Sequence, residues 1–147
     1  MLNIFTKTFK ELSIDELYAI LQLRSEVFVV EQDCVYQDID YKDQNALHVM
    51  GYKNDQLVAY TRVFKPDDYF DHAGIGRVLV RAGERHLKYG YDIMEASIHL
   101  IEEVYNETKI KISAQTYLKR FYNNLGFVEV GDDYLEDGIP HIAMLKT

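Results

Sequence analysis

An apolar run passes directly into a cationic segment and then into a helical pattern between Val78 and Met94. The run Val78–Val80 has the character of a buried strand. Over residues 90–104, apolar residues recur at three- and four-residue steps, as on one face of an amphipathic helix. A strand that leads directly into a helix is typical of proteins that mix the two elements around one sheet. This junction therefore places the end of a sheet strand next to the start of a covering helix.

The other segments predict a single mixed domain over residues 1–147. Hydrophobic residues make up 48% of the chain and charged residues 27%, as in ordinary globular domains. The expected elements are an N-terminal strand, a helix after Ser13, a hairpin over 46–65, a strand over 75–80, a helix over 90–104, a strand over 109–114, a helix over 115–126, and two strands around an acidic loop over 127–146. This order predicts an α/β (mixed α+β) fold with a central sheet covered by helices.

Local signals sharpen two of these elements. Ser13 and Glu16 have the spacing of a capping box at a helix start. Asn54 and Asp55 are turn residues between two β-prone runs. The apolar residues expected on the buried face of the first helix and its continuation are Ile14, Leu17, Leu21, Val27 and Phe28.

Charge and cysteine content exclude several classes of protein. The net charge of -8 argues against broad binding to nucleic acids or anionic membranes. No apolar run approaches the roughly 20 residues that span a bilayer, and the N-terminal stretch lacks the apolar region of a signal peptide. Cys34 is the single cysteine, which excludes an internal disulfide and a zinc site of paired cysteines and favours a cytoplasmic location. No metal site is expected around His48, His72 or His99.

The strand-to-helix junction has the features of an anion site. Phosphates bind readily at helix N-termini, where backbone N–H groups are unpaired and the partial charge is positive. Gly90 has no side chain to block a phosphate, and Arg85, His86 and Lys88 would add charge-assisted contacts. The alternative is a solvated first turn with scattered charge, and spacing alone does not separate the two. The segment is neither a Walker loop nor a Rossmann motif.

The segment Arg85–Gly90 resembles the acetyl-CoA motif [RQ]-x-x-G-x-[GA] of the GCN5-related N-acetyltransferases, the GNAT family. Lys88 stands where that motif has its first glycine, and the pattern R-x-x-K-x-G is similar to that of the ElaA-like branch. Further stretches that resemble this branch cover residues 17–40, 75–80, 114–127 and 136–144. Several long patterns in the same order are more specific than one short motif.

The resemblance implies both a fold and a ligand. The fold would be the GNAT-type acyl-CoA N-acyltransferase fold, with a central mixed, mostly antiparallel sheet flanked by helices, and acetyl-CoA would be the acyl-donor substrate. The backbone of Val78, Leu79 and Val80 would pair with the pantetheine arm as an added strand does, while core packing equally explains their side chains. The pyrophosphate would lie beside Arg85 on the backbone N–H groups of His86, Leu87, Lys88, Tyr89, Gly90 and Tyr91.

The same resemblance implies catalytic roles. Gln115 would contact the cofactor, and Tyr122 would contact it and protonate the departing CoA thiolate. A phenol pKa of about 10 against a thiol pKa of about 8.5 makes that transfer feasible. A base or a chain of waters would deprotonate the amine, and Glu31 and His141 are the candidate bases. From the residues alone, Gln115 is also a polar residue at a helix start, Tyr122 part of an apolar stripe, Glu31 a charge at a helix end and His141 a strand residue bonded to backbone.

The acidic stretch 31–45 predicts a loop with a short helical turn. Its carboxylates, among them Asp33, Asp38 and Asp40, would either attract a cationic amine or simply be solvated.

These patterns favour an acetyl-CoA-dependent N-acetyltransferase that acts on a small amine or an exposed amino group. A non-catalytic module that binds CoA as a sensor or partner is the alternative. A phosphotransferase that uses ATP is disfavoured, because the junction lacks a Walker lysine pattern. The acceptor amine is not defined by the sequence. Edge strands after residue 126 would allow a homodimer.

Overall fold

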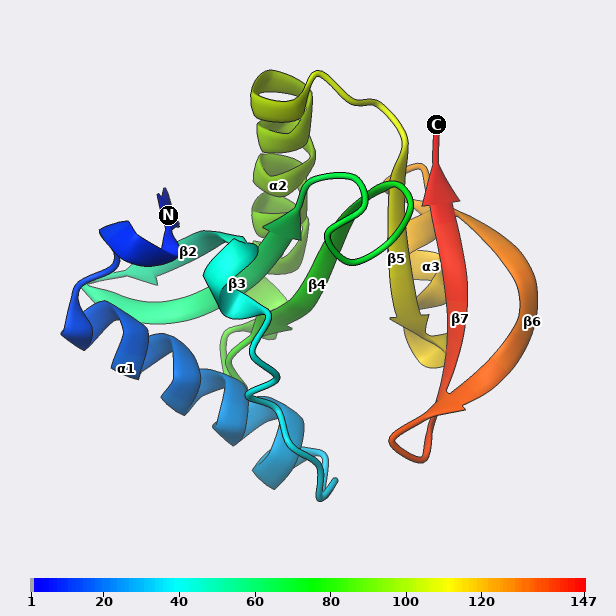
Figure 1. Cartoon of the computed structure of the whole chain (residues 1–147). Helices are drawn as coiled ribbons and strands as arrows, with labels where there is room; N and C mark the ends of the chain where they lie inside the picture. The colour runs from blue at the N-terminus through cyan, green and yellow to red at the C-terminus, as the bar shows by residue number, and fades with distance from the viewer. Residues whose placement is uncertain (1) are drawn as a thin grey trace.

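Seven strands form one continuous sheet in the computed structural model, which describes residues 2–147 (Figure 1). The strands are β1 (Asn3–Thr8), β2 (Leu47–Lys53), β3 (Gln56–Phe64), β4 (Ala73–Val80), β5 (Ile110–Gln115), β6 (Val128–Glu136) and β7 (Ile139–Lys146), in the spatial order β1-β2-β3-β4-β5-β7-β6. The β4–β5 pair is parallel and the other neighbouring pairs are antiparallel. This arrangement confirms the predicted mixed, mostly antiparallel sheet.

Helices cover both faces of this sheet, as predicted. Helices α2 (Tyr89–Tyr105) and α3 (Lys119–Asn123) pack on one face, and α1 (Ile14–Arg24) packs on the other. Val49 lies in the core under α2 and its neighbour Met50 in the core under α1, because successive strand side chains point to opposite faces. None of the helices in this described part of the chain is both long and apolar enough to cross a membrane.

The first helix begins as predicted but buries a different face. Ser13 and Glu16 form the capping box, with a Glu16 N–Ser13 Oγ distance of 3.0 Å and a Ser13 N–Glu16 Oε1 distance of 2.8 Å. Ile14, by contrast, is 86% exposed. The buried residues of α1 are Ile20, Leu23 and Arg24. The prediction is confirmed for Val27, which is buried, and is wrong for Ile14. It missed the buried Arg24, whose charge is paired with aspartates inside the protein, because apolar periodicity treats an arginine as solvent-facing.

Two segment boundaries near the C-terminus also differ from the predicted ones. Gln115 ends β5 rather than opening a helix, because its backbone pairs with His141 of β7, and α3 begins only at Lys119. The acidic loop predicted within residues 127–146 belongs largely to β6, which has a bulge between Val130 and Tyr134. Since β6 is an exposed edge strand, its acidic side chains face water and do not oppose strand formation.

The loop after α1 is held to the sheet by buried charges. The helix continues as a π-helical segment, Ser25–Glu31, and a 3₁₀ turn follows at Asp43–Asn45. Three arginines from α1, β3 and β4 meet three aspartates of this loop: Arg24, Arg62, Arg77, Asp38, Asp40 and Asp43. Equal numbers of opposite charges offset the cost of burial, which is large for an unpaired ion. This ionic network therefore fixes a segment that has little regular structure of its own.

The pairing of Asp40 with Arg62 predicts a specific acid dependence of stability. Burial alone would raise the pKa of Asp40, but the hydrogen bonds and charge of Arg62 outweigh it and lower that pKa to about 2. The unfolded chain has an aspartate pKa of about 3.9. The contribution of Asp40 is therefore present above about pH 4 and is lost as the pH falls from about 4 towards 2.

Urea unfolding of the wild type and of Asp40→Asn at several pH values measures this contribution. The difference in unfolding free energy between the two proteins should be constant at neutral pH and should shrink below about pH 4. A difference that does not change down to pH 2 would contradict the assignment.

Candidate active site

Strands β4 and β5 separate shortly after they meet. Their register pairs only Ala73 with Ile110 and Gly74 with Lys111. The far edge of β4 pairs with β3 and the far edge of β5 pairs with β7. The facing edges beyond Gly74 and Lys111 therefore present backbone N–H and C=O groups that no neighbouring strand pairs.

A bulge in β4 accompanies this separation. The register with β3 shifts between Tyr60 and Arg62, and Arg77 takes a left-handed conformation with φ of 49°. A bulged residue bends its strand and increases the local twist. The side chain of Arg77 is held by the loop, with Nε 2.7 Å from Asp38 Oδ1, which stabilises a backbone conformation uncommon for a residue other than glycine.

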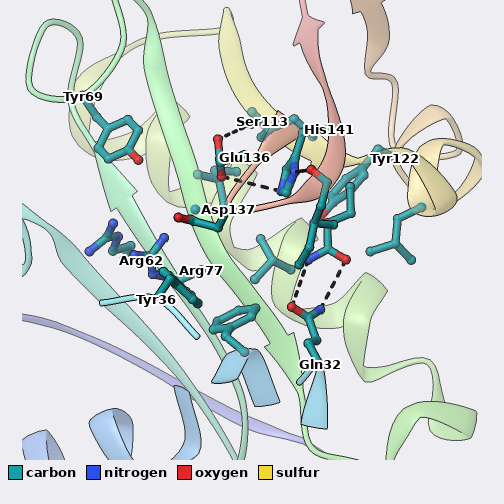
Figure 2. Close-up of a pocket in the computed structure, with 18 of the residues that line it drawn as sticks. Gln32, Tyr36, Arg62, Tyr69, Arg77, Ser113, Tyr122, Glu136, Asp137 and His141 are labelled. Atoms are coloured by element: carbon teal, nitrogen blue, oxygen red, sulfur yellow. Dashed lines mark hydrogen bonds and ion pairs between the residues drawn. The ribbon is translucent and has the colours of Figure 1, made fainter. Parts of the chain in front are cut away.

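A cleft with a cavity volume of about 110 Å³ lies where the two strands part (Figure 2). It brings together four residues singled out in the sequence, Val78, Gln115, Tyr122 and His141. Other residues that line it are Phe28, Gln32, Cys34, Tyr36, Arg62, Phe64, Tyr69, Phe70, Ile75, Gly76, Arg77, Ile112, Ser113, Leu118, Glu136, Asp137 and Ile139. Leu79, Val80, Glu31 and the junction residues 85–91 are not part of its lining.

Tyr122 of α3 is buried at this cleft, with 6% of its surface exposed. Its ring packs edge-on against Phe121 and Phe127, with centroids 5.0 and 6.1 Å away. No hydrogen bond to its hydroxyl occurs within residues 2–147. Burial raises the pKa of Tyr122 above the ordinary tyrosine value, so the hydroxyl keeps its proton at neutral pH. It is thus a proton donor without a protein partner.

Gln115 and His141 occupy neighbouring positions on β5 and β7. The side-chain amide of Gln115 exchanges hydrogen bonds with that of Gln32, at 3.3 and 3.4 Å. The ring of His141 is nearly buried, and its Nδ1 lies 2.7 Å from the Ile139 carbonyl oxygen.

Arg85 and Glu31 form an ion pair at the strand-to-helix junction. The guanidinium of Arg85 donates to both carboxylate oxygens of Glu31, at 2.5 and 2.8 Å, and its Nε donates to the Val80 carbonyl at 2.9 Å. The hydrogen bond with Glu31 raises the pKa of Arg85, although burial acts in the opposite direction. Arg85, which the sequence assigns to the phosphate, is thus bonded to Glu31, one of the two candidate bases.

Helix α2 begins at Tyr89, directly after Lys88 in a left-handed conformation with φ of 62°. The preceding residues, Arg85–Leu87, form a 3₁₀ turn, and His86 and Lys88 are exposed. Tyr89 is buried, so its side chain is not presented at the helix start.

Gly90 also has a packing reason that the sequence did not indicate. A Cβ atom at this position would lie 3.2 Å from Cζ of Phe121, which is tighter than ordinary contact. The glycine therefore lets α2 and α3 approach each other closely.

Several cleft residues were not predicted from the sequence. One of them, Ser113, could have been found, because the alternation of side chains along β5 places it on the same face as Gln115. Glu136, Arg62 and Arg77 reach the cleft through strand register and the β4 bulge, which join residues far apart along the chain.

A family model described as an acetyltransferase (GNAT) domain matches residues 7–147. The chain belongs to the GNAT family. Among curated proteins, ElaA of Escherichia coli is 45% identical over 138 residues, which cover 92% of this chain and 90% of that protein. A UPF0039 protein of Synechocystis is 41% identical over 138 residues, with 93% and 90% covered.

Solved structures agree with this assignment. The crystal structure of an acyl-CoA N-acyltransferase from Pseudomonas aeruginosa superposes with a TM-score of 0.93 at 40% identity, covering 100% of both chains. The crystal structure of Escherichia coli ElaA superposes with a TM-score of 0.93 at 42% identity, also over 100% of both. The resemblance to ElaA-like GNAT proteins is confirmed. This GNAT chain is an acyltransferase, and its fold implies an acyl-CoA donor.

Proposed function

We propose that this GNAT enzyme transfers an acetyl group from acetyl-CoA to a primary amine by direct attack of the amine on the thioester. The observation that carries this proposal is the gap between β4 and β5. Its unpaired strand edges meet a cleft that contains Tyr122, a buried proton donor with no hydrogen-bond partner among residues 2–147. The reducing cytosol is the expected location, because the single cysteine forms no disulfide.

Donor binding follows from the two edges of the gap. The backbone of Val78–Val80 would hydrogen-bond to the amide groups of the pantetheine arm, as a sheet edge does to an added strand. The N–H groups of Tyr89 and Gly90 at the start of α2 would take the pyrophosphate. The predicted N–H donors of Leu87 and Tyr91 instead donate to the carbonyl oxygens of Glu84 and Lys88. Arg85 already holds a carboxylate through two parallel hydrogen bonds, a geometry that a phosphate also satisfies.

The proposed chemistry needs an acid and a base. When the amine nitrogen bonds to the thioester carbon, the carbon–sulfur bond breaks and the CoA sulfur leaves as a thiolate. Tyr122 would donate its proton to that sulfur. Alkyl amines carry a proton at pH 7 because their pKa is about 10, so the amine must first lose a proton to become a nucleophile.

Thermal unfolding with separate nucleotides tests the donor. A ligand present at about 100 times its Kd stabilises the native state by about 2.7 kcal/mol, which corresponds to a rise in Tm of about 5–10 °C for a chain of this size. CoA and acetyl-CoA should both give a rise of this order, and ATP should not. No shift with either CoA form at millimolar concentration would refute the proposal.

Release of free thiol in the presence of acetyl-CoA and a panel of primary amines tests turnover. An enzyme releases CoA only when a suitable amine is present. A protein that binds acetyl-CoA but releases no thiol with any amine would instead be a CoA-binding sensor.

A further inference from the structure

The outer strands bring five polar side chains to one face of the sheet beside the cleft. In the β5–β7–β6 ladder, His141 pairs with Gln115 on one side and with Tyr134 on the other. Because side chains alternate along a strand, Ser113 and Glu136 lie on this same face. The intervening residues of β5 and β7, Ile112, Ala114 and Ile142, face the core under α2 and α3.

The hydrogen bond of His141 defines where its lone pair lies. Its Nδ1 is 2.7 Å from the Ile139 carbonyl oxygen, which can only accept, so Nδ1 must carry a proton. In the neutral ring, the lone pair is therefore on Nε2. The residue is 7% exposed and stacks on Tyr134, with ring centroids 6.2 Å apart. Within the described chain, no donor is hydrogen-bonded to Nε2.

A second acceptor faces this lone pair. Glu136 Oε2 lies 3.6 Å from His141 Nε2, which is too long for a direct hydrogen bond (Figure 2). The other oxygen, Oε1, accepts a hydrogen bond from Ser113 Oγ at 3.1 Å, which orients the carboxylate. Ser113 in turn is hydrogen-bonded to the Tyr134 hydroxyl. A hydrogen-bond donor placed beside both Glu136 Oε2 and His141 Nε2 could therefore donate to each of them.

The charge of the cleft favours a cation as that donor. Arg62 and Arg77 line the cleft, but both are paired with aspartates of the ionic network. Glu136 and Asp137 on the opposite wall have no lysine or arginine partner in the part of the chain that the structure describes. A cationic head group is therefore attracted to the wall formed by β6 and β7.

We propose that Glu136 and His141 form the acceptor subsite, which binds the ammonium group of a primary alkyl amine. The Glu136 carboxylate holds the ammonium, and His141 Nε2 takes one of its protons. This inference rests on the proposed function, because it names the acceptor class and the base of the same reaction.

The proton balance is complete. The neutral amine attacks the thioester carbon, the carbon–nitrogen bond forms and the carbon–sulfur bond breaks. Tyr122 protonates the sulfur, and the second proton lost from nitrogen returns to Tyr122 through the cleft. His141 releases its proton to solvent, so each turnover yields an amide, free CoA and one proton.

Two substitutions separate holding the amine from deprotonating it. Glu136→Gln keeps the shape but removes the charge, so KM for an alkyl ammonium should rise about tenfold while kcat changes little. His141→Asn can still donate to the Ile139 carbonyl but lacks Nε2, so kcat at pH 7 should fall about 100-fold while KM is kept. The matched control is Glu129→Gln, an exposed position on the same strand whose carboxylate is bonded to Asn123 outside the cleft.

The pH profile provides a readout that a structural defect would not give. In His141→Asn, only amine that is already neutral reacts, so kcat/KM should rise about tenfold per pH unit from pH 7 to 9, and the wild type should rise much less. For 2,2,2-trifluoroethylamine, which is largely neutral at pH 7, the defect should nearly vanish. The groups that face His141 are Glu136 and Tyr134 of β6 and Ser113 and Gln115 of β5. The other titratable groups that line the same cleft are Cys34, Tyr36, Arg62, Tyr69, Arg77, Tyr122 and Asp137.

The probes are Nα-acetyl-lysine, 1,4-diaminobutane and phenethylamine as alkyl ammonium ions and 4-methoxyaniline as a neutral aryl amine. A loss in His141→Asn that is the same at every pH and for every amine would overturn the role of His141. An unchanged KM in Glu136→Gln, or preference for the aryl amine, would overturn the subsite. If the wild type binds CoA but acetylates none of the alkyl amines, the acceptor class is wrong. Failure to bind CoA would instead refute the proposed function itself.

Discussion

Replacing Tyr122 by phenylalanine should lower kcat for acetyl transfer by about 100-fold or more and leave the affinity for CoA unchanged. General acid catalysis by a positioned side chain contributes about 10² to 10⁴ to the rate, and the substitution removes the proton donor. The hydroxyl has no hydrogen-bond partner within residues 2–147, and the ring contacts with Phe121 and Phe127 remain. The fold should therefore be kept. Steady-state kinetics with thiol detection and a CoA thermal shift measure the two quantities.

Tyr117→Phe is the matched control for this prediction. Tyr117 lies in the 3₁₀ turn just before α3 but is 73% exposed and does not line the cleft. Its loss should leave kcat within about twofold of the wild type. If Tyr122→Phe retains wild-type kcat, the CoA thiolate is protonated by another group, and Tyr122 has only a packing role.

Replacing Asp43 by asparagine should lower the free energy of unfolding by about 3–5 kcal/mol, the usual cost of removing one partner from a buried ionic group. Asp43 Oδ1 lies 2.7 Å from Arg24 Nη1 and 2.9 Å from Arg62 Nη1, so one carboxylate serves two buried guanidinium groups. Burial opposes the ionised form, but both arginines outweigh it and keep the pKa of Asp43 below its usual value. Such a loss is a large part of the 5–15 kcal/mol that stabilises a typical domain.

Urea unfolding followed by circular dichroism measures this loss as a fall in the transition midpoint. Lys53→Met provides the comparison, because it removes an ion pair at the protein surface, where the Nζ of Lys53 lies 2.9 Å from Glu84. Its effect on the midpoint should be much smaller. Equal effects of the two substitutions would mean that the network does not act as a buried unit.

Much of the secondary structure was predictable because local signals specify it. The capping box at Ser13 and the turn at Asn54 and Asp55 involve neighbouring residues, and both are confirmed. The buried face of α1 was not predictable, since the position of Arg24 depends on aspartates 14 and 19 residues further along the chain. A charged side chain can be buried only where an opposite charge meets it, and the periodicity of a helix does not reveal that distant partner.

Some features of the candidate site were also predictable from the sequence, and others were not. The sequence by itself determined the family, the strand-to-helix junction and the presence of Tyr122 on a helix that follows β5, because these are contiguous patterns. Only the tertiary structure decided that Gly90 accommodates Phe121, that Arg85 faces Glu31, and that Glu136 lies beside His141. Each of these contacts arises from strand register, a bulge or helix packing, which join distant segments, and so it becomes visible only when the chain is folded.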